Sequence, residues 1–398
     1  MTRDGDDPPA YDLLLRGGTI VDPDAHERFI GDVAVAGGQI AAVGPALDPR
    51  GATRVVELSG KILTPGLVDL HAHGYWGVTY DGLNVDAVAG RTGVTTWVDA
   101  GSSGAATFPG FRHYVIEPST TRIVPFLNLC AIGIIYRGVL EFNDLRYADV
   151  PFAVETIEEH RDLIAGIKVR LGRAIVGDSG DQALWLARDV ADHTGLPLLV
   201  HLGLPPPSIR EILGALQPGD IVTHCFRGGV GGIVLGGKIR ADVRAARRRG
   251  VLFDIGHGSG SFSFATAREA LDDGFPPDSI STDLHQLSIR GPAHDLPTVM
   301  SKFLALGMTL EDVVRRVTIN PATAIRRVDG TGTLRVGAPA DLAVSVLEDG
   351  DFEFVDVMGT TVRGQQRLKN VMTFRAGREM DRTRDYGALP LFVRPRDY

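Results

Sequence analysis

The chain has 398 residues, of which 44% are hydrophobic and 23% are charged, so it can bury a sizeable core and is not mostly disordered. Its 41 lysines and arginines against 49 acidic residues give a formal net charge of −8, which argues against a surface for nucleic acid or anionic membranes. Its two cysteines, Cys130 and Cys225, cannot build a disulfide framework, and its polar, acidic start does not have the pattern of a signal peptide. We therefore expect a cytoplasmic protein that has neither nucleic-acid nor membrane partners.

Both ends of the chain contain short apolar or alternating runs that end at turn residues. Leu13–Arg16 is one example near the start, and Leu342–Val346 is one near the end. Neither end shows the pattern of a long helix. Residues 1–62 and 333–398 together therefore predict one small β-sandwich domain that is built from both chain ends.

The middle of the chain, residues 63–332, repeats a strand-then-helix pattern at intervals of about 30 residues, which is the length that a β-α unit needs. The helix predicted over Gln182–Thr194, for example, stops at Gly195. Eight runs are predicted as strands: Gly66–His73, Thr95–Asp99, Ile123–Cys130, Gly166–Arg170, Leu198–His201, Asp220–Cys225, Val251–Asp254 and Ser279–Asp283. Eight such units predict an α/β fold, a (β/α)8 TIM barrel.

Two histidines, His71 and His73, close the first predicted strand. Residues two apart on a strand point to the same face, and active sites of barrels lie at the carboxyl ends of their strands. Two imidazoles in that place form half of a divalent-metal site. The alternative is that both histidines pack in the core.

Four more polar residues lie at the ends of later predicted strands. Lys168 belongs to the fourth strand, His201 closes the fifth, His224 lies at the end of the sixth, and Asp283 closes the eighth. A barrel presents its catalytic groups at these positions. Together with the first two histidines they indicate an active site and not a chance distribution.

Lys168 needs a separate argument, because a protonated lysine repels a metal ion and cannot bind it. Burial next to cations lowers the pKa of a lysine and makes the neutral amine accessible. A neutral amine can add carbon dioxide and become a carbamate, which is a carboxylate that can bridge two metals. The alternative for Lys168 is an ion pair with Asp99 or Asp254.

This set of residues resembles the amidohydrolase superfamily, in its branch with a carboxylated lysine and two metals. It is most similar to the deacetylase-type metallohydrolases that are often called dihydroorotase-like. The resemblance covers nearly the whole chain and is more specific for the metal site than for the substrate. Matching segments include Thr64–Gly77, Ile167–Leu171, Leu196–Pro207, Gly219–Gly228, Gly250–Phe264 and Pro277–Lys302.

The resemblance implies two divalent metal ions. The first two histidines and the aspartate of the set would bind the more buried ion, the other two histidines would bind the more exposed ion, and the carboxylated lysine would bridge both. Zinc is favoured by the four imidazoles, and manganese or cobalt also fits. The implied ligands are His71, His73, Lys168, His201, His224 and Asp283.

The resemblance also implies a hydrolytic mechanism, in which a hydroxide between the two metals attacks a carbonyl while Asp283 acts as general base and then as general acid. We therefore expect a metal-dependent amidohydrolase or deacetylase. Its partner would be a small-molecule acylated carboxylic acid, such as an N-acetyl or O-acetyl compound. The enzyme would cleave the C–N amide or acyl ester bond of this substrate. The alternative is a cyclic amidase that opens a ring, as dihydroorotase or hydantoinase does. A homo-oligomer is expected by analogy with other such barrels.

Five further residues are candidates for substrate contact: Tyr75, Arg170, His257, His285 and Arg290. Tyr75 stands where dihydroorotase-type enzymes carry the arginine of His-x-His-x-Arg, which disfavours the ring-opening alternative. It would donate a hydrogen bond to the substrate or simply pack. Arg170 shares a strand face with Lys168, so it would bind a substrate carboxylate or form an internal salt bridge. The other three lie in predicted loops after the last two strands.

Overall fold

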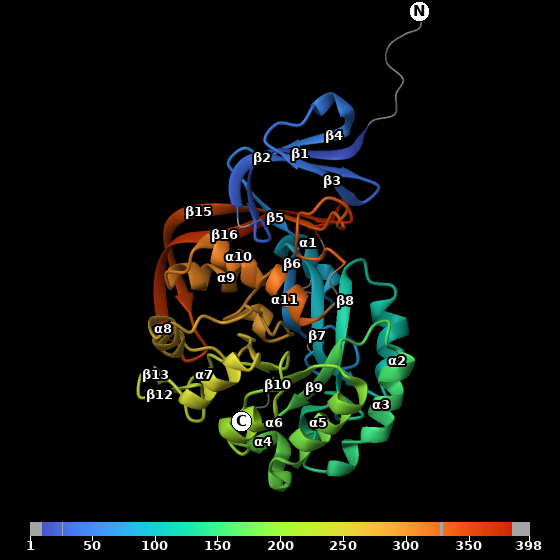
Figure 1. Cartoon of the computed structure of the whole chain (residues 1–398), viewed down its shortest axis with the longest axis vertical. Helices are drawn as coiled ribbons and strands as arrows, with labels where there is room; N and C mark the ends of the chain where they lie inside the picture. The colour runs from blue at the N-terminus through green and yellow to red at the C-terminus, as the bar shows by residue number, and fades with distance from the viewer. Residues whose placement is uncertain (1–9, 26, 327–328, 384–398) are drawn as a thin grey trace, which may run out of the picture.

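The computed structural model describes residues 10–25, 27–326 and 329–383, and two sheets organise them (Figure 1). The first has seven strands that pair only in parallel, in the order β14-β11-β10-β9-β8-β7-β6. Helices follow most of these strands, as the sequence predicted, so the α/β class is confirmed. The strands are β6 (Leu67–Ala72), β7 (Val94–Gly104), β8 (Arg122–Asn128), β9 (Gly166–Arg170), β10 (Leu198–His201), β11 (Ile221–Thr223) and β14 (Leu252–Phe253).

The prediction of an eighth strand over Ser279–Asp283 is wrong, because this segment forms no ladder. Isolated parallel pairs join Ser279 to Asp254 and Leu284 to Ala72, so the segment lies between the last and the first strand. Side chains take up the backbone groups that a ladder would use, since the amide of Thr282 donates to the carboxylate of Asp69 at 3.0 Å. The parallel sheet thus curls round toward itself, and its two edge strands are linked by an irregular segment.

The helices cover the outer side of this sheet (Figure 1). Predicted Gln182–Thr194 is helix α5 with the same bounds, and its buried residues lie on one face. A short hairpin of β12 (Val234–Leu235) and β13 (Lys238–Ile239) precedes α7. The helices are α1 (Asp86–Thr92), α2 (Phe108–Phe111), α3 (Val150–Glu159), α4 (Arg173–Val176), α5, α6 (Ile209–Ala215), α7 (Ala241–Arg248), α8 (Phe264–Asp272), α9 (Leu296–Ala305), α10 (Leu310–Arg316) and α11 (Ile319–Ala324).

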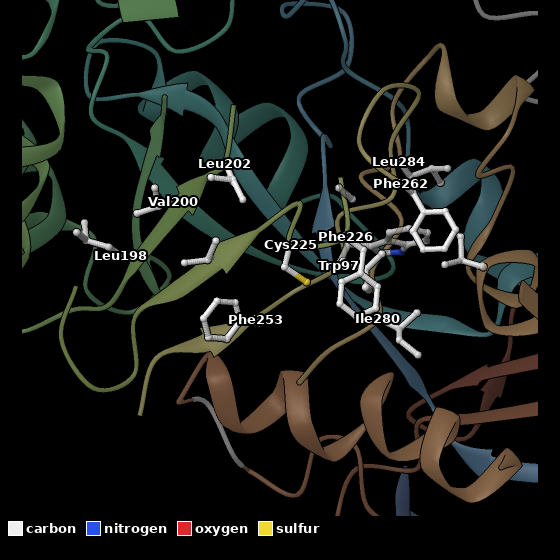
Figure 2. Close-up of a cluster of buried hydrophobic side chains, with 14 of the residues drawn as sticks. Trp97, Leu198, Val200, Leu202, Cys225, Phe226, Phe253, Phe262, Ile280 and Leu284 are labelled. Atoms are coloured by element: carbon white, nitrogen blue, oxygen red, sulfur yellow. The ribbon is translucent and has the colours of Figure 1, made fainter. Parts of the chain in front are cut away.

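The main hydrophobic core lies between strands and helices. Figure 2 shows part of it, in which Trp97, Phe226, Phe253 and Phe262 are all buried. Cys225 belongs to the same cluster. This is expected for a small core residue that follows His224 and faces away from it, toward the helices. Apolar side chains thus fill the helix side of the sheet, and a second apolar cluster joins strand residues such as Phe126 and Leu199 to residues of α11. Polar groups gather at the carboxyl ends of the strands.

The second sheet joins both ends of the chain in the order β17-β16-β15-β5-β1-β2-β3, with β4 paired to β1. The predicted β-sandwich is not confirmed, because hydrogen bonds connect these strands into one sheet. The boundaries 1–62, 63–332 and 333–398 stay a prediction. The strands are β1 (Tyr11–Asp22), β2 (Glu27–Ala36), β3 (Gln39–Gly44), β4 (Ala52–Glu57), β5 (Ile62–Pro65), β15 (Leu342–Val355), β16 (Thr361–Arg375) and β17 (Arg378–Glu379).

The hairpin of β15 and β16 is much longer than the predicted run Leu342–Val346. It passes over α9, where the amide of Leu368 donates to the hydroxyl of Ser301 at 2.9 Å. Its turn reaches the start of α8, where Asp356 accepts a hydrogen bond from the amide of Phe264 at 2.8 Å. The hairpin therefore contacts both α9 and the start of α8.

Among the helices that the structure describes, none is long and apolar enough to cross a membrane.

Candidate active site

A cavity of about 340 Å³ lies at the carboxyl ends of the parallel strands. Its lining includes all six residues that the sequence predicted as metal ligands: His71, His73, Lys168, His201, His224 and Asp283. Three of them lie on the strands β6, β9 and β10, and the other three lie in the segments that follow β6, β11 and β14. The fold therefore brings together residues that are up to 212 positions apart in the sequence.

Asp283 is at the centre of this group. Its Oδ1 lies 3.4 Å from Nε2 of His71 and 3.2 Å from Nε2 of His73. Side-chain atoms of His71, His224 and Asp283 all lie within 4.8 Å of one another, and the rings of His201 and His224 are 4.4 Å apart between centroids. The arrangement offers a compact set of nitrogen and oxygen atoms of the kind that binds divalent transition metals.

Hydrogen bonds on the far side of the rings fix which nitrogen faces the cavity. Thr223 donates its hydroxyl hydrogen to Asp254 at 2.7 Å, so Nδ1 of His71, 2.8 Å from the same hydroxyl oxygen, must be the donor. Nδ1 of His224 lies 2.7 Å from the carbonyl oxygen of Gly256, which can only accept. In both rings the Nε2 lone pair is therefore left for the cavity, as in metal-binding histidines.

Burial keeps these imidazoles neutral. It lowers the pKa of His71 well below its ordinary value, with the charge of Lys168 acting in the same direction. Burial also lowers the pKa of His201 well below the usual range and that of His224 to about 4. A neutral imidazole can donate a lone pair to a cation, so the pKa shifts agree with the ligand geometry.

Lys168 is 1% exposed, and its Nζ has no hydrogen-bond partner among the residues that the structure describes. The alternative of an ion pair with Asp99 or Asp254 is not observed. Burial lowers the pKa of Lys168 to about 7. The lysine stem lies against Gly101, where an added Cβ would come within 2.5 Å of Cβ and Cγ of Lys168 and where φ is +82°. The structure thus makes room for a buried amine and leaves it unpaired.

Comparison with known proteins identifies the chain. The model of the amidohydrolase family matches residues 258–372. A deacetylase of Agrobacterium fabrum is 42% identical over 335 residues, which cover 83% of this chain and 82% of that protein. The chain belongs to the amidohydrolase family. Membership of this family and the relatives that are named deacetylase make it a hydrolase.

Two solved structures share the whole architecture of this amidohydrolase. One is titled as an adenine deaminase and superimposes with a TM-score of 0.87 at 31% identity, covering 93% of this chain and 100% of that one. The other is titled as a dihydroorotase and gives a TM-score of 0.85 at 38% identity, covering 92% and 97% of the two chains. Their different titles mean that the shared fold leaves the substrate open.

Of the five residues predicted to contact substrate, two line the cavity of the amidohydrolase. Arg170 forms the salt bridge that was its alternative role, with Nη1 2.6 Å from Oε1 of Glu141 and 3.3 Å from the hydroxyl of Tyr80. His285 also lines the cavity, and its Nδ1 lies 3.7 Å from Asp81. Both side chains are accessible from the cavity in which a substrate would bind.

The other three do not line the cavity. Tyr75 packs on Phe111, with ring centroids 4.6 Å apart, and its hydroxyl donates to the carbonyl of Thr107 at 3.2 Å. His257 is fully buried beneath the loop after β14, and Arg290 is exposed to solvent. For Tyr75 the structure favours the alternative in which the side chain only packs.

Sequence reasoning missed several groups that shape the site. Thr223 and Asp254 orient His71, and Glu141 pairs with Arg170. The ends of predicted strands held a signal for the first two, because Thr223 precedes His224 and Asp254 closes a predicted run. Glu141 gave none, since it lies in an irregular loop where Leu140 and Glu141 itself adopt positive φ of 55° and 27°.

Proposed function

We propose that this amidohydrolase cleaves the C–N amide or acyl ester bond of a small acylated carboxylic acid, with two divalent metal ions in the cavity. The observation that carries the proposal is the lining of one cavity by all six predicted ligands. Four imidazoles favour zinc, and manganese or cobalt is also compatible. The unpartnered, buried Nζ of Lys168 supports the carbamate that would bridge the two ions.

The residues present fit such a metal pair. Nε2 of His71 and Nε2 of His73 face the same carboxylate oxygen of Asp283. His201 ends β10 and His224 follows β11, and these two histidines would hold the second ion. When bound, the metal ions would supply the positive charge that polarises a carbonyl group and lowers the pKa of water.

Asp283 is the group that we assign to proton transfer. Its carboxylate lies on the cavity wall and is held in place by the segment around it, in which the Ser288 hydroxyl donates to the Asp283 carbonyl at 2.8 Å. We infer that Asp283 takes a proton from the attacking water and passes it to the leaving amine or alcohol. A carboxylate that can receive and return a proton serves both halves of the reaction.

Arg170 is the group that we assign to the carboxylate of the substrate. Both of its contacts, to Glu141 and to Tyr80, use Nη1, and a guanidinium carries N–H donors on two further nitrogens. A planar fork of donors suits a carboxylate better than a single ammonium does. Glu141 would hold the guanidinium in place while the remaining donors face the cavity.

A cyclic amidase is the second candidate. The solved structure that is titled as a dihydroorotase favours it, at 38% identity over nearly the whole chain. The relative named deacetylase, at 42% identity, favours the open-chain reaction. Tyr75 also disfavours the cyclic alternative, because its side chain packs on Phe111 and offers no charged donor to a substrate carboxylate.

A mass-spectrometric screen tests the proposal. Enzyme loaded with zinc in the presence of bicarbonate is mixed with N-acyl amino acids, O-acyl hydroxy acids, cyclic imides and adenine. Two smaller products from an acylated acid would support the proposal. Gain of one water without fragmentation of an imide would support the cyclic amidase and overturn it. Release of ammonia from adenine, or no turnover with two metals bound, would also contradict it.

A further inference from the structure

A second buried lysine, Lys302 on α9, lies beneath the loop that follows β14. It is 1% exposed, and its Nζ has three acceptors: Nε2 of His257 at 2.7 Å, the carbonyl of Pro292 at 2.8 Å and the carbonyl of Val355 at 2.8 Å. An ammonium group carries three hydrogens, so each of them has a partner. Lys302 thereby joins three segments that are distant in the sequence.

His257 connects Lys302 to the loop. Its Nδ1 lies 2.9 Å from the carbonyl of Gly258, which only accepts, so Nδ1 carries the hydrogen and Nε2 is free to accept from Lys302. The ring stacks on Phe262 with centroids 4.6 Å apart, and the His257 amide donates to the carbonyl of Ser281 at 3.1 Å. The backbone amide of His257 thus ties the loop to the segment that leads to Asp283, and its side chain ties the loop to Lys302.

The next residue, Gly258, lies directly against the proposed proton carrier. Its amide donates to the carbonyl of Thr282 at 2.8 Å, and an added Cβ would come within 2.4 Å of Oδ2 of Asp283. Ser259, Gly260 and Ser261 then line the cavity. A shift of this loop would therefore change both the wall of the cavity and the space beside the Asp283 carboxylate.

The hairpin of β15 and β16 holds the other end of the loop. The Val357 amide donates to the carbonyl of Phe262 at 3.3 Å, and Asp356 accepts from the amide of Phe264 at 2.8 Å. Val355 of the same hairpin is one of the three acceptors of Lys302. The loop is consequently fixed from both sides by residues outside the cavity.

We propose that Lys302 is a positioning residue that, through His257, holds the loop 256–263 against Asp283 and sets the shape of the substrate-binding wall. This inference rests on the proposed roles of Asp283 and of the cavity. Lys302 touches none of the six predicted metal ligands by a hydrogen bond or ion pair among the described residues. Its loss should therefore leave the metal content unchanged and act on substrate binding.

The test uses Lys302→Met, His257→Phe and the double variant, with Lys238→Met as the matched control. Phenylalanine keeps the stacking on Phe262 and removes both the acceptor of Lys302 and the donor to the Gly258 carbonyl. The Lys238 side chain is 74% exposed and, within the described part of the chain, pairs only with Asp273, so its substitution should have no effect. For the acylated acid that the wild type turns over, we expect KM to rise about tenfold with a smaller change in kcat.

Two further readouts separate positioning from general destabilisation. The double variant should be no worse than the worse single variant, because each substitution already removes the hydrogen bond between Lys302 and His257. Amide hydrogen exchange of residues 257–264 should be faster in both single variants at unchanged metal content. Additive losses in kcat/KM, or unchanged exchange in the loop, would overturn the proposal. Exchange needs no substrate, so it decides the role of Lys302 even if the screen contradicts the proposed function.

Discussion

Two buried lysines of this molecule have the same exposure and opposite surroundings. Lys168 and Lys302 are each 1% exposed, and burial lowers the pKa of each to about 7. Lys302 has three hydrogen-bond acceptors, whereas Lys168 has none among the described residues. A buried polar group without a partner costs stability, so it persists only where something else requires it.

The difference separates a group that completes the site from one that supports it. A lysine whose N–H donors are all hydrogen-bonded within the fold needs no further partner. A lysine with none used, surrounded by imidazoles and a carboxylate, fits the proposed carbamate and metal ions. Four substitutions test this contrast and the positions around it.

Lys168→Ala should have the largest effect. We expect loss of most of the bound metal and a fall in turnover of at least about 10³-fold, because the bridge between the two ions is removed. Short carboxylic acids added to this variant should restore part of the activity. Metal content by mass spectrometry and turnover with and without formate or propionate are the measurements, and full metal content at full rate would contradict the carbamate.

Asp283→Asn should come next. Asp283 has a φ of +47°, a region that asparagine also tolerates, so the variant changes the charge and keeps the backbone. We expect both metals to remain and kcat to fall about 10²- to 10⁴-fold, as for the loss of a general acid–base group. Steady-state kinetics beside metal analysis is the measurement. An active Asp283→Asn enzyme would refute the role in proton transfer.

Arg170→Lys should affect binding more than turnover. The ammonium can still pair with Glu141, but the planar fork is lost, so KM for acids with a free carboxylate should rise about tenfold or more. The same compounds as methyl esters serve as controls and should show no change. Equal changes for acids and esters would mean that Arg170 has only a structural role.

Tyr75→Phe should have the smallest effect. It removes one hydrogen bond to the Thr107 carbonyl, which is worth about 1 kcal/mol of stability, and keeps the stacking on Phe111. We expect kcat/KM to change by less than about threefold, since a tenfold change corresponds to about 1.4 kcal/mol of transition-state binding. A larger loss with an unchanged melting temperature would mean that the phenol meets the substrate.

Strand periodicity explains how far the sequence alone could predict the site. His71 and His73 share a face because side chains alternate along a strand, and the same rule carries Lys168 and Arg170 to the cavity. The rule stops where the strand stops. β6 ends at Ala72, the alternation persists for one more residue to His73, and the backbone then turns so that Tyr75 packs on Phe111.

Contacts that loop residues make with side chains of other elements could not be predicted in this way. Glu141 meets Arg170 across 29 positions, and His257 meets Lys302 across 45. No local pattern relates such pairs, since both depend on how irregular segments cross the strand ends. The eighth strand failed for a related reason, because the Asp69 carboxylate takes an amide that a ladder would have used, and no periodicity reveals that competition.

The pairing of β5 with β15 has a consequence for the order in which the protein matures. Ile62–Pro65 finds its partner at Leu342–Ser345, so this part of the sheet cannot close on the ribosome until more than four-fifths of the chain has been translated. The hairpin turn that fixes the loop beside Asp283 emerges later still. A nascent chain stalled before residue 342 would hold all six predicted ligands and lack the hairpin that secures the loop, so activity should arise only after the hairpin has been translated.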